Sequence, residues 1–432
     1  MKKQREQVYK HLKEEDPEIY RAVSGELDRQ QSGLEMIPSE SYASRAVLEA
    51  IGSILNNKYS EGYPKKRYYA GQKYTDIVEQ IAIKRAKKLF RVDHVNVQPY
   101  SGSPANFAAL NAVCAPGDAI MGMDLRFGGH LTHGWKVNVT AKYFKSISYT
   151  TDKNGFIDFN EVETLAKKHK PKIIICGATA YPRVIDFVKF SKIAKKVGAY
   201  LMADIAHIAG LVAAGVHPSP AGIADIITTT THKTLRGPRA GMIMCNGNPS
   251  NFLKPIKNPA KKDLPTLIDR SIFPGMQGGP HMHTIAGIAV ALKEAGTKEF
   301  KKWAKQVVKN CQKLAEIFNA RGLRLMTGGT DNHLILMDVT PFKITGKEAE
   351  ERLEKIGISL NKNAIPHDPN PPYNPSGIRL GTPCVTIRGM KEQEMEILGN
   401  AIADILESKR NIKKSAKVIR ELCEEFPLYN GM

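Results

Sequence analysis

Polar residues follow several short apolar runs of this sequence, at positions where the ends of strands would place them. Asp204 comes near the end of the run at 199–206, and His232 and Lys233 directly follow the run at 224–231. In parallel sheets, ligands bind beyond the carboxyl ends of the strands. A lysine held there among groups that stabilise its charge less well than water has a lowered pKa, and its amine becomes a nucleophile toward an aldehyde.

A small-residue turn supplies a third feature of this kind. Ser101, Gly102 and Ser103 follow the short run "VNVQPY" and lead into an apolar helical segment. Free N–H groups and the helix dipole at such a turn attract a phosphate. Taken singly, the turn and Asp204 are also typical of simple helix N-caps. Taken together, the features match three parts of pyridoxal 5'-phosphate, with Asp204 on the pyridine nitrogen and Lys233 on the aldehyde carbon.

Other strand ends carry further candidates. The polar or small residues after the remaining apolar runs are Gly128, Gly129, His130, Thr179 and His207. Considered alone, His207 is more typical of a buried histidine that has hydrogen-bond partners in the core.

The elements that must position these residues follow an alternating pattern. Apolar runs at 118–124, 172–179, 199–206 and 224–231 are separated in several places by helical segments such as 186–198. This pattern predicts β-α units that form a mostly parallel sheet covered on both faces.

The chain of 432 residues is too long for one core, since single cores stop growing at about 250 to 300 residues. We expect an N-terminal arm over residues 1–35, a large domain over 36–294 and a smaller α+β domain over 295–432. The last of these begins after the Gly/Pro-rich stretch "FPGMQGGPHMH".

Composition limits the function classes. The net charge is +20, but the lysines are spread along helical segments without a basic tail, which favours a solvated basic surface over nucleic-acid binding. The six cysteines show no metal-ligand spacing and indicate reduced thiols. Without a signal-peptide pattern or an apolar run of about 18 residues, the chain is expected to be cytoplasmic, with no membrane partner.

From about Pro38 to Arg388 the chain resembles the serine hydroxymethyltransferases. The motifs are "NKYSEGYPKKRYY", "NVQPYSGSPAN", "GGHLTHG", "DIAHIAGLVAAG", "TTTTHKTLRGPR", "FPGMQGGPHMH", "GGTDNHL" and "SGIRLGTP". The resemblance implies the α/β fold of fold type I pyridoxal-phosphate transferases, in which the large domain contains a mostly parallel, seven-stranded sheet. It implies reversible conversion of serine and tetrahydrofolate to glycine and 5,10-methylenetetrahydrofolate, in one-carbon metabolism.

The resemblance also implies roles for individual residues. The implied catalytic residues are Lys233, Glu61, His232 and Tyr69. The implied cofactor-binding residues are Ser101, Gly102, Ser103, His130, Thr179, Asp204, His207, Thr230, Lys233, Gly279 and Tyr59. The implied substrate-binding residues are Ser39 and Arg379 for the amino acid, and Leu125, Gly129, His130, Leu131 and Asn363 for the folate side. No metal is implied.

In this family the loop with Glu61 and the turn with Gly279 serve the partner's site, so a homodimer with shared sites is implied. Phe127 departs from the polar residue or histidine expected before "GGH". Two other functions remain open: a folate-independent aldolase acting on threonine-like β-hydroxy amino acids, and a basic nucleic-acid-binding protein with a decayed site. The folate-side motifs weigh against the first, and intact Lys233, Asp204 and Arg379 weigh against the second.

Overall fold

A computed structural model describes residues 8–248, 263–408 and 411–430. The chain divides into two compact units, one formed by residues 41–305 and the other by residues 1–40 together with 306–432. The boundary near residue 305 falls inside helix α13 (Lys298–Ala320). Each unit has its own sheet.

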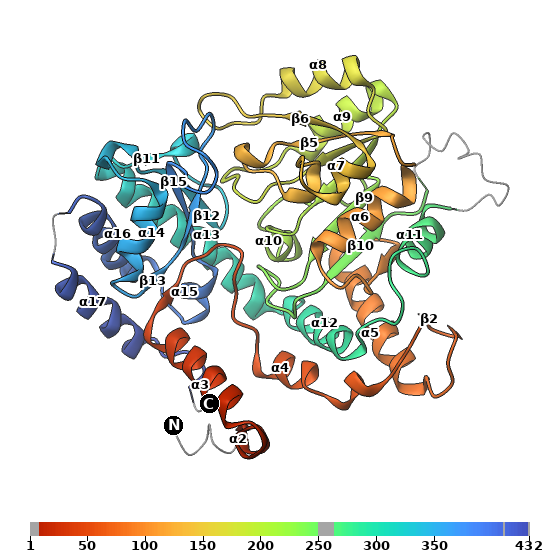
Figure 1. The fold of residues 1–432 in the computed structure, drawn as a ribbon, viewed down its shortest axis with the longest axis horizontal. Helices are drawn as coiled ribbons and strands as arrows, with labels where there is room; N and C mark the ends of the chain where they lie inside the picture. Colours follow the sequence, from red (N-terminus) through yellow and green to blue (C-terminus); the bar gives the residue numbers. More distant parts are fainter. Residues whose placement is uncertain (1–7, 249–262, 409–410, 431–432) are drawn as a thin grey trace. The chain divides into compact units, whose positions relative to one another are not determined.

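The unit at 41–305 is built on a seven-stranded sheet with the order β4-β10-β9-β8-β7-β5-β6 (Figure 1). The strands are β4 (His94–Asn96), β5 (Ala119–Met123), β6 (Lys145–Tyr149), β7 (Ile173–Cys176), β8 (Tyr200–Asp204), β9 (Ile226–Thr230) and β10 (Gly241–Cys245). Strand β10 runs in the opposite direction to the other six, because it pairs antiparallel with both β4 and β9 while the remaining pairs are parallel. The predicted mostly parallel sheet is therefore confirmed, and the four apolar runs form β5, β7, β8 and β9.

Helices cover both faces of this sheet. The α-helices that lie wholly within the described part of this unit are α4 (Arg45–Ile51), α5 (Lys73–Phe90), α6 (Gly102–Val113), α7 (Val139–Tyr143), α8 (Phe159–His169), α9 (Phe187–Val197), α10 (Ala209–Ala213), α11 (Leu264–Ile272) and α12 (Met282–Ala295). Ile173 and Ile175 pack into a core with α6 and α11. Because side chains alternate along a strand, Ile174 and Cys176 point to the opposite face, where α9 contacts the strand.

The helix boundaries follow local sequence signals. Asp186 caps α9, since its side chain accepts a hydrogen bond from the backbone N–H of Lys189. The helix ends at Gly198, whose φ of 71° suits a glycine in the left-handed region.

The other unit contains a four-stranded antiparallel sheet with the order β11-β12-β15-β14. Its strands are β11 (Arg324–Leu325), β12 (Leu334–Asp338), β14 (Asn361–Asn363) and β15 (Gly377–Gly381), and its helices include α14 (Gly346–Glu354), α15 (Pro383–Ile387), α16 (Glu392–Leu406) and α17 (Ile412–Glu425). The N-terminal helices α2 (Lys10–Glu15) and α3 (Pro17–Ser32) belong to the same unit. Strand β1 (Leu34–Glu35) pairs with β13 (Ile358–Ser359), which places Leu34 in this unit's core.

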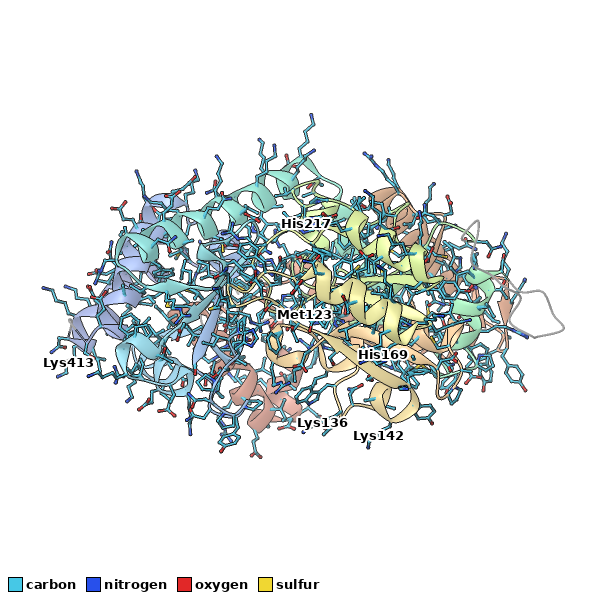
Figure 2. All side chains as sticks on the ribbon, turned by 90° about the horizontal axis from the view of Figure 1, so that it is seen from above. Met123, Lys136, Lys142, His169, His217 and Lys413 are labelled. Atoms are coloured by element: carbon cyan, nitrogen blue, oxygen red, sulfur yellow. The ribbon has the colours of Figure 1, made fainter. Side chains whose placement is uncertain are left out.

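Basic side chains lie on the outside of both units. Lys136, Lys142 and Lys413 are all exposed, and Figure 2 shows Lys136 and Lys142 near each other on one unit and Lys413 on the other. All six cysteines are buried, and none of them is in a disulfide bond. Among the described residues, no helix is both long enough and apolar enough to cross a membrane.

Candidate active site

The strand-end residues singled out in the sequence lie on neighbouring strands. Asp204 is the last residue of β8 and pairs in register with Thr228 of β9, and Lys233 follows three residues after β9 ends. Both side chains are buried, with exposed fractions of 8% for Asp204 and 9% for Lys233. A carboxylate and an amine have therefore been removed from water at the same edge of the sheet.

Asp204 is held by three hydrogen bonds. Its Oδ2 accepts from Asn106 Nδ2 at 2.8 Å and from His133 Nε2 at 3.0 Å, and its Oδ1 accepts from the backbone N–H of Ala206 at 3.0 Å. Burial alone would raise the pKa of Asp204, but the hydrogen bonds from His133 and Asn106 oppose the effect of burial, and the pKa is held well below its usual range. The carboxylate is therefore an oriented anion.

Two histidines surround this carboxylate with defined tautomers. His133 Nδ1 accepts the backbone N–H of His130, and His130 Nδ1 accepts the backbone N–H of Thr132. A neutral imidazole whose Nδ1 accepts a hydrogen bond carries its proton on Nε2. Burial lowers the pKa of His130 to about 4, so this ring is neutral at physiological pH.

The donor atoms of His130, His133 and Asp204 lie within 4.8 Å of one another, a spacing that could hold a metal ion. However, Nε2 of each ring carries the proton in this tautomer, so it has no lone pair with which to bind a metal ion. The geometry therefore favours a hydrogen-bond network. His133 was not among the residues predicted from the sequence, although it stands in the motif "GGHLTHG" three positions after His130.

The predicted phosphate turn is fitted closely against β9. Ser101 is the N-cap residue of α6, and a Cβ placed on Gly102 would lie 2.6 Å from Thr230 Cγ2. Only glycine fits between the turn and Thr230, so the backbone N–H groups at the start of α6 stay uncovered by a side chain at this position.

Thr179 supports a second turn. Its hydroxyl Oγ1 donates to the carbonyl oxygen of Gly129 at 3.0 Å, and its backbone N–H donates to Gly128 at 2.7 Å. A Cβ on Gly129 would lie 2.0 Å from the carbonyl oxygen of Met123, so the turn passes directly over the end of β5. These contacts fix the turn between Leu125 and His130. Leu131, which follows it, is 44% exposed.

The loop that carries His232 and Lys233 is closed by hydrogen bonds to two backbone carbonyls. The Thr231 hydroxyl donates to the carbonyl of Pro238, and the Gly237 N–H donates to the carbonyl of Thr231 at 2.8 Å. Burial, together with the charge of Arg239, lowers the pKa of His232 to about 3.

His207 is buried beside the same loop. Its carbonyl oxygen accepts from the hydroxyl of Thr234 at 2.9 Å, and this hydroxyl also accepts the N–H of Gly210. The lysine loop is thus tied to the segment after β8.

A second cluster brings together Tyr59, Glu61, Tyr69 and the 278–279 turn. The rings of Tyr59 and Tyr69 meet edge to face with centroids 5.4 Å apart. A Cβ on Gly279 would lie 3.0 Å from the Tyr59 ring, and one on Gly278 would lie 3.1 Å from Glu61 Oε1. The negative charge of Glu61 raises the pKa of Tyr69.

Three predicted substrate residues belong to the other unit. Arg379 lies on β15, and its Nε donates to Asn361 Oδ1 on the neighbouring β14 at 3.0 Å. Burial lowers the pKa of Arg379 to about 10, which leaves it protonated at neutral pH. Asn361 was not predicted, since nothing local in the sequence connects it to Arg379.

Ser39 and Asn363 flank the same strand. The chain just before Ser39 passes beside the end of β15, because the N–H of Gly381 donates to the carbonyl of Met36 at 2.8 Å. Asn363 on β14 pairs in register with Gly377. Its Nδ2 donates to the carbonyl of Ala364 at 2.7 Å.

Comparisons with known proteins agree with the motifs. A family model described as serine hydroxymethyltransferase matches residues 12–402. A protein of Sorangium cellulosum (strain So ce56), named serine hydroxymethyltransferase, is 53% identical to this chain over 420 residues, which cover 96% of each sequence.

Proposed function

The chain belongs to the serine hydroxymethyltransferase family, and from this membership we propose that it converts serine and tetrahydrofolate reversibly to glycine and 5,10-methylenetetrahydrofolate. The structural observation that carries the proposal is the pair of buried groups at adjacent strand ends, Asp204 and Lys233. One group is an oriented carboxylate, and the other is an amine that water stabilises little.

The residues at these strand ends fit pyridoxal 5'-phosphate. The start of α6 at Ser101, Gly102 and Ser103 would receive the phosphate, since Gly102 leaves the backbone N–H groups open. Asp204 would pair with the pyridine nitrogen, and Lys233 would bind the aldehyde carbon covalently. When bound, the cofactor would accept the electron pair released as a bond to the substrate Cα breaks.

Further residues would orient the ring. His130 would stack on it as a neutral imidazole, and His207 would hydrogen-bond its hydroxyl group. Thr230 packs against Gly102 and would border the phosphate. Thr179 would act by holding the turn before His130. His232, whose lowered pKa keeps it neutral, would shape the surroundings of the lysine without adding charge.

Arg379 would bind the carboxylate of the amino acid, with Ser39 as a second contact. A guanidinium binds a carboxylate with two parallel hydrogen bonds, a geometry that a lysine cannot offer. Asn361 occupies Nε of Arg379 and so orients the plane of the fork. Anchoring the carboxylate limits rotation about the substrate Cα, and therefore limits which bond is broken.

Glu61 would hold or transfer a proton at the substrate hydroxymethyl group or a folate nitrogen, with Tyr59 and Tyr69 beside it. Tyr59 and Tyr69 are 58% and 44% exposed in the single chain. Exposed aromatic rings next to Glu61 and Gly279 support a homodimer in which this cluster completes the partner's site. Leu125, Gly129, Leu131 and Asn363 would contact the folate. We also propose a cytoplasmic location.

The test is to supply the purified chain with pyridoxal 5'-phosphate and measure conversion of serine to glycine with and without tetrahydrofolate. We expect turnover that depends on both additions. Glycine formed equally well from threonine-like substrates, with no effect of folate on serine, would instead indicate a folate-independent aldolase. Sedimentation analysis of the same sample checks the dimer.

A further inference from the structure

The short hairpin that follows Glu61 is too small to hold its own position. Strands β2 (Gly62–Tyr63) and β3 (Lys66–Arg67) pair over two residues each. Isolated two-stranded hairpins are at best marginally stable in water. The position of Glu61 therefore depends on how the hairpin is attached to the rest of its unit.

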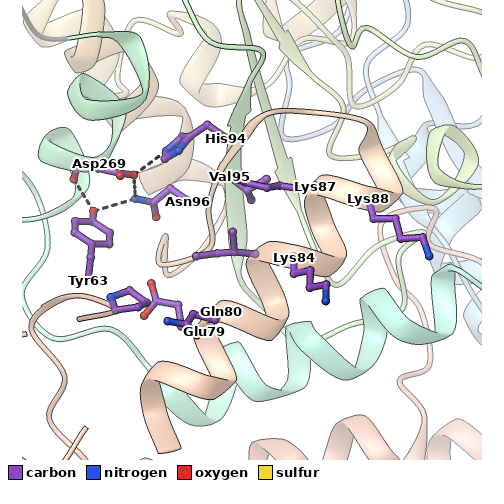
Figure 3. A pocket seen from close by; sticks show the side chains of 12 residues that line it. Tyr63, Glu79, Gln80, Lys84, Lys87, Lys88, His94, Val95, Asn96 and Asp269 are labelled. Atoms are coloured by element: carbon purple, nitrogen blue, oxygen red, sulfur yellow. Dashed lines mark hydrogen bonds and ion pairs between the residues drawn. The ribbon is translucent and has the colours of Figure 1, made fainter. Parts of the chain in front are cut away.

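Side-chain packing does not attach the hairpin on every side. A pocket of about 690 Å³ borders Tyr63 and Pro64, and residues of α5 and β4 line it as well (Figure 3). At one end of this pocket the Tyr63 hydroxyl donates to the carbonyl of Asp269 at 2.6 Å and accepts from Asn96 Nδ2 at 2.9 Å. Because the pocket leaves this side of the hairpin without side-chain packing, polar contacts of this kind hold the hairpin in place.

Arg67 makes the most extensive of these contacts. Its Nη1 donates to the carbonyl oxygens of Ser60 at 2.8 Å and Gly62 at 2.9 Å, the residues on either side of Glu61. Its Nε donates to Asp76 Oδ1 at 2.9 Å, and its Nη2 donates to Glu79 Oε2 at 2.5 Å. One guanidinium thus connects the backbone around Glu61 to helix α5.

The ion pair between Arg67 and Glu79 is almost fully buried, with side-chain exposures of 3% and 1%. Gln98 completes the network, because its Nε2 donates to both Glu79 Oε1 and the carbonyl of Gly62. Burying two charges is expensive, and apolar residues of similar volume often stabilise a protein at least as well. The planar guanidinium of an arginine fixes the directions of its hydrogen bonds, whereas apolar packing fixes no such directions.

We propose that Arg67 is a positioning residue for Glu61. By holding the two carbonyl groups that flank Glu61, it determines where the carboxylate stands for proton transfer. This rests on the function proposed above, in which Glu61 handles that proton.

The Arg67→Lys variant tests the proposal, because one ammonium group keeps the charge but cannot reach both carboxylates and both carbonyls in the fork geometry. Misplacing a catalytic group by about 1 Å can reduce turnover by about 100-fold. We expect kcat to fall on the order of 10- to 100-fold, with little change in KM for serine.

A double-mutant cycle separates positioning from general destabilisation. If Arg67 acts through Glu61, then Arg67→Lys should have little further effect on kcat in a Glu61→Gln background. A full multiplicative loss in that background would overturn the proposal. A parent-like rate for Glu61→Gln alone would overturn both the role of Glu61 in the proposed function and the role of Arg67.

Arg388 offers a matched control in the other unit. It is also a buried arginine that donates to backbone carbonyls, among them Gly33 at 2.7 Å and Phe426 at 2.8 Å. Arg388→Lys should lower thermal stability comparably, while turnover per folded molecule stays near the parent value. An equal loss of kcat in both variants would contradict a specific role for Arg67.

If Arg67→Lys does not fold, Glu79→Gln addresses the same contact. The amide oxygen still accepts from Arg67 but without charge, so the guanidinium is held less firmly. We expect kcat to fall less than in Arg67→Lys. When Glu79→Gln is combined with Glu61→Gln, we expect little further fall in kcat. A folded Glu79→Gln variant with the parent kcat would overturn the proposal.

Discussion

The hydrogen bond from His133 to Asp204 should determine how strongly the chain holds its cofactor. Burial is the largest influence on the pKa of Asp204 and acts to raise it, and the hydrogen bond from His133 is the largest influence that lowers it. Without that donor, the carboxyl group should take up a proton more easily. A neutral carboxylic acid cannot form an ion pair with a protonated pyridine nitrogen.

The size of the effect follows from the strength of one hydrogen bond to a charged group, about 1.5 to 3 kcal/mol. Since about 1.4 kcal/mol changes a binding constant tenfold, His133→Leu should weaken cofactor binding by about 10- to 100-fold. The bonds from Asn106 and from the backbone of Ala206 remain, and they limit the loss.

His133→Gln is the matched control. A glutamine amide nitrogen can reach the position of Nε2 and donate to Asp204, whereas both variants lose the acceptor of the His130 N–H. The comparison therefore isolates the bond to Asp204 from other damage at this turn. Thermal unfolding of the two cofactor-free variants checks that they are equally stable.

The assay is titration of the cofactor-free protein with pyridoxal 5'-phosphate at pH 6 and pH 8.5, monitored by absorbance. We expect the affinity of His133→Leu to decrease toward pH 6, where more of its Asp204 is protonated. The glutamine variant should stay close to the parent. Equal affinities for leucine and glutamine variants at both pH values would refute the reasoning.

Other predictions follow from the same structure. Borohydride reduction of the loaded protein should attach the cofactor mass to the peptide containing Lys233, and Lys233→Ala should abolish both this label and turnover; a labelled, active variant would exclude Lys233. Arg379→Lys should raise KM for serine about tenfold or more, because the two-point contact is lost, while the affinity for cofactor is unchanged. His130 and His232 have folded-state pKa values of about 4 and about 3, below the usual 6.5. The unfolded chain therefore takes up protons first, and the free energy of unfolding should decrease as the pH falls from about 6.5 to about 4; urea titrations should show a shallower decrease for His130→Asn. Burial and the charge of a neighbouring carboxylate raise the pKa of Glu35 to about 7, so Glu35→Gln should stabilise the protein at pH 8 and not at pH 4; equal effects at both pH values would count against this shift.

The sheet and the ends of its central strands could be predicted because their signals are local. Apolar runs of four to five residues form β5, β7, β8 and β9, and each is followed within a few positions by a polar or small residue. The antiparallel direction of β10 was not predicted, since no local sequence pattern distinguishes the direction of this strand from that of the parallel strands in the sheet.

The partners of the candidate catalytic groups were harder to find. Asn106 and Asp204 are 98 positions apart in the sequence, and only the fold brings them within hydrogen-bond distance. Arg67 stands in the segment "KKRYY", where a basic residue is typical of a solvated surface. The side chain of Arg67 is nearly completely buried because it pairs with Glu79 on helix α5, which begins six positions after Arg67.

The candidate groups share a physical arrangement, which explains why these groups could be predicted from the sequence and their hydrogen-bond partners could not. Asp204 is oriented by His133, Arg379 by Asn361, and the backbone around Glu61 by Arg67. A group that binds substrate must keep part of its hydrogen-bonding capacity free, so its direction has to be set by a second polar residue from another segment. Substitutions at these second residues should therefore change reaction rates and pH dependence while the motif residues themselves remain intact.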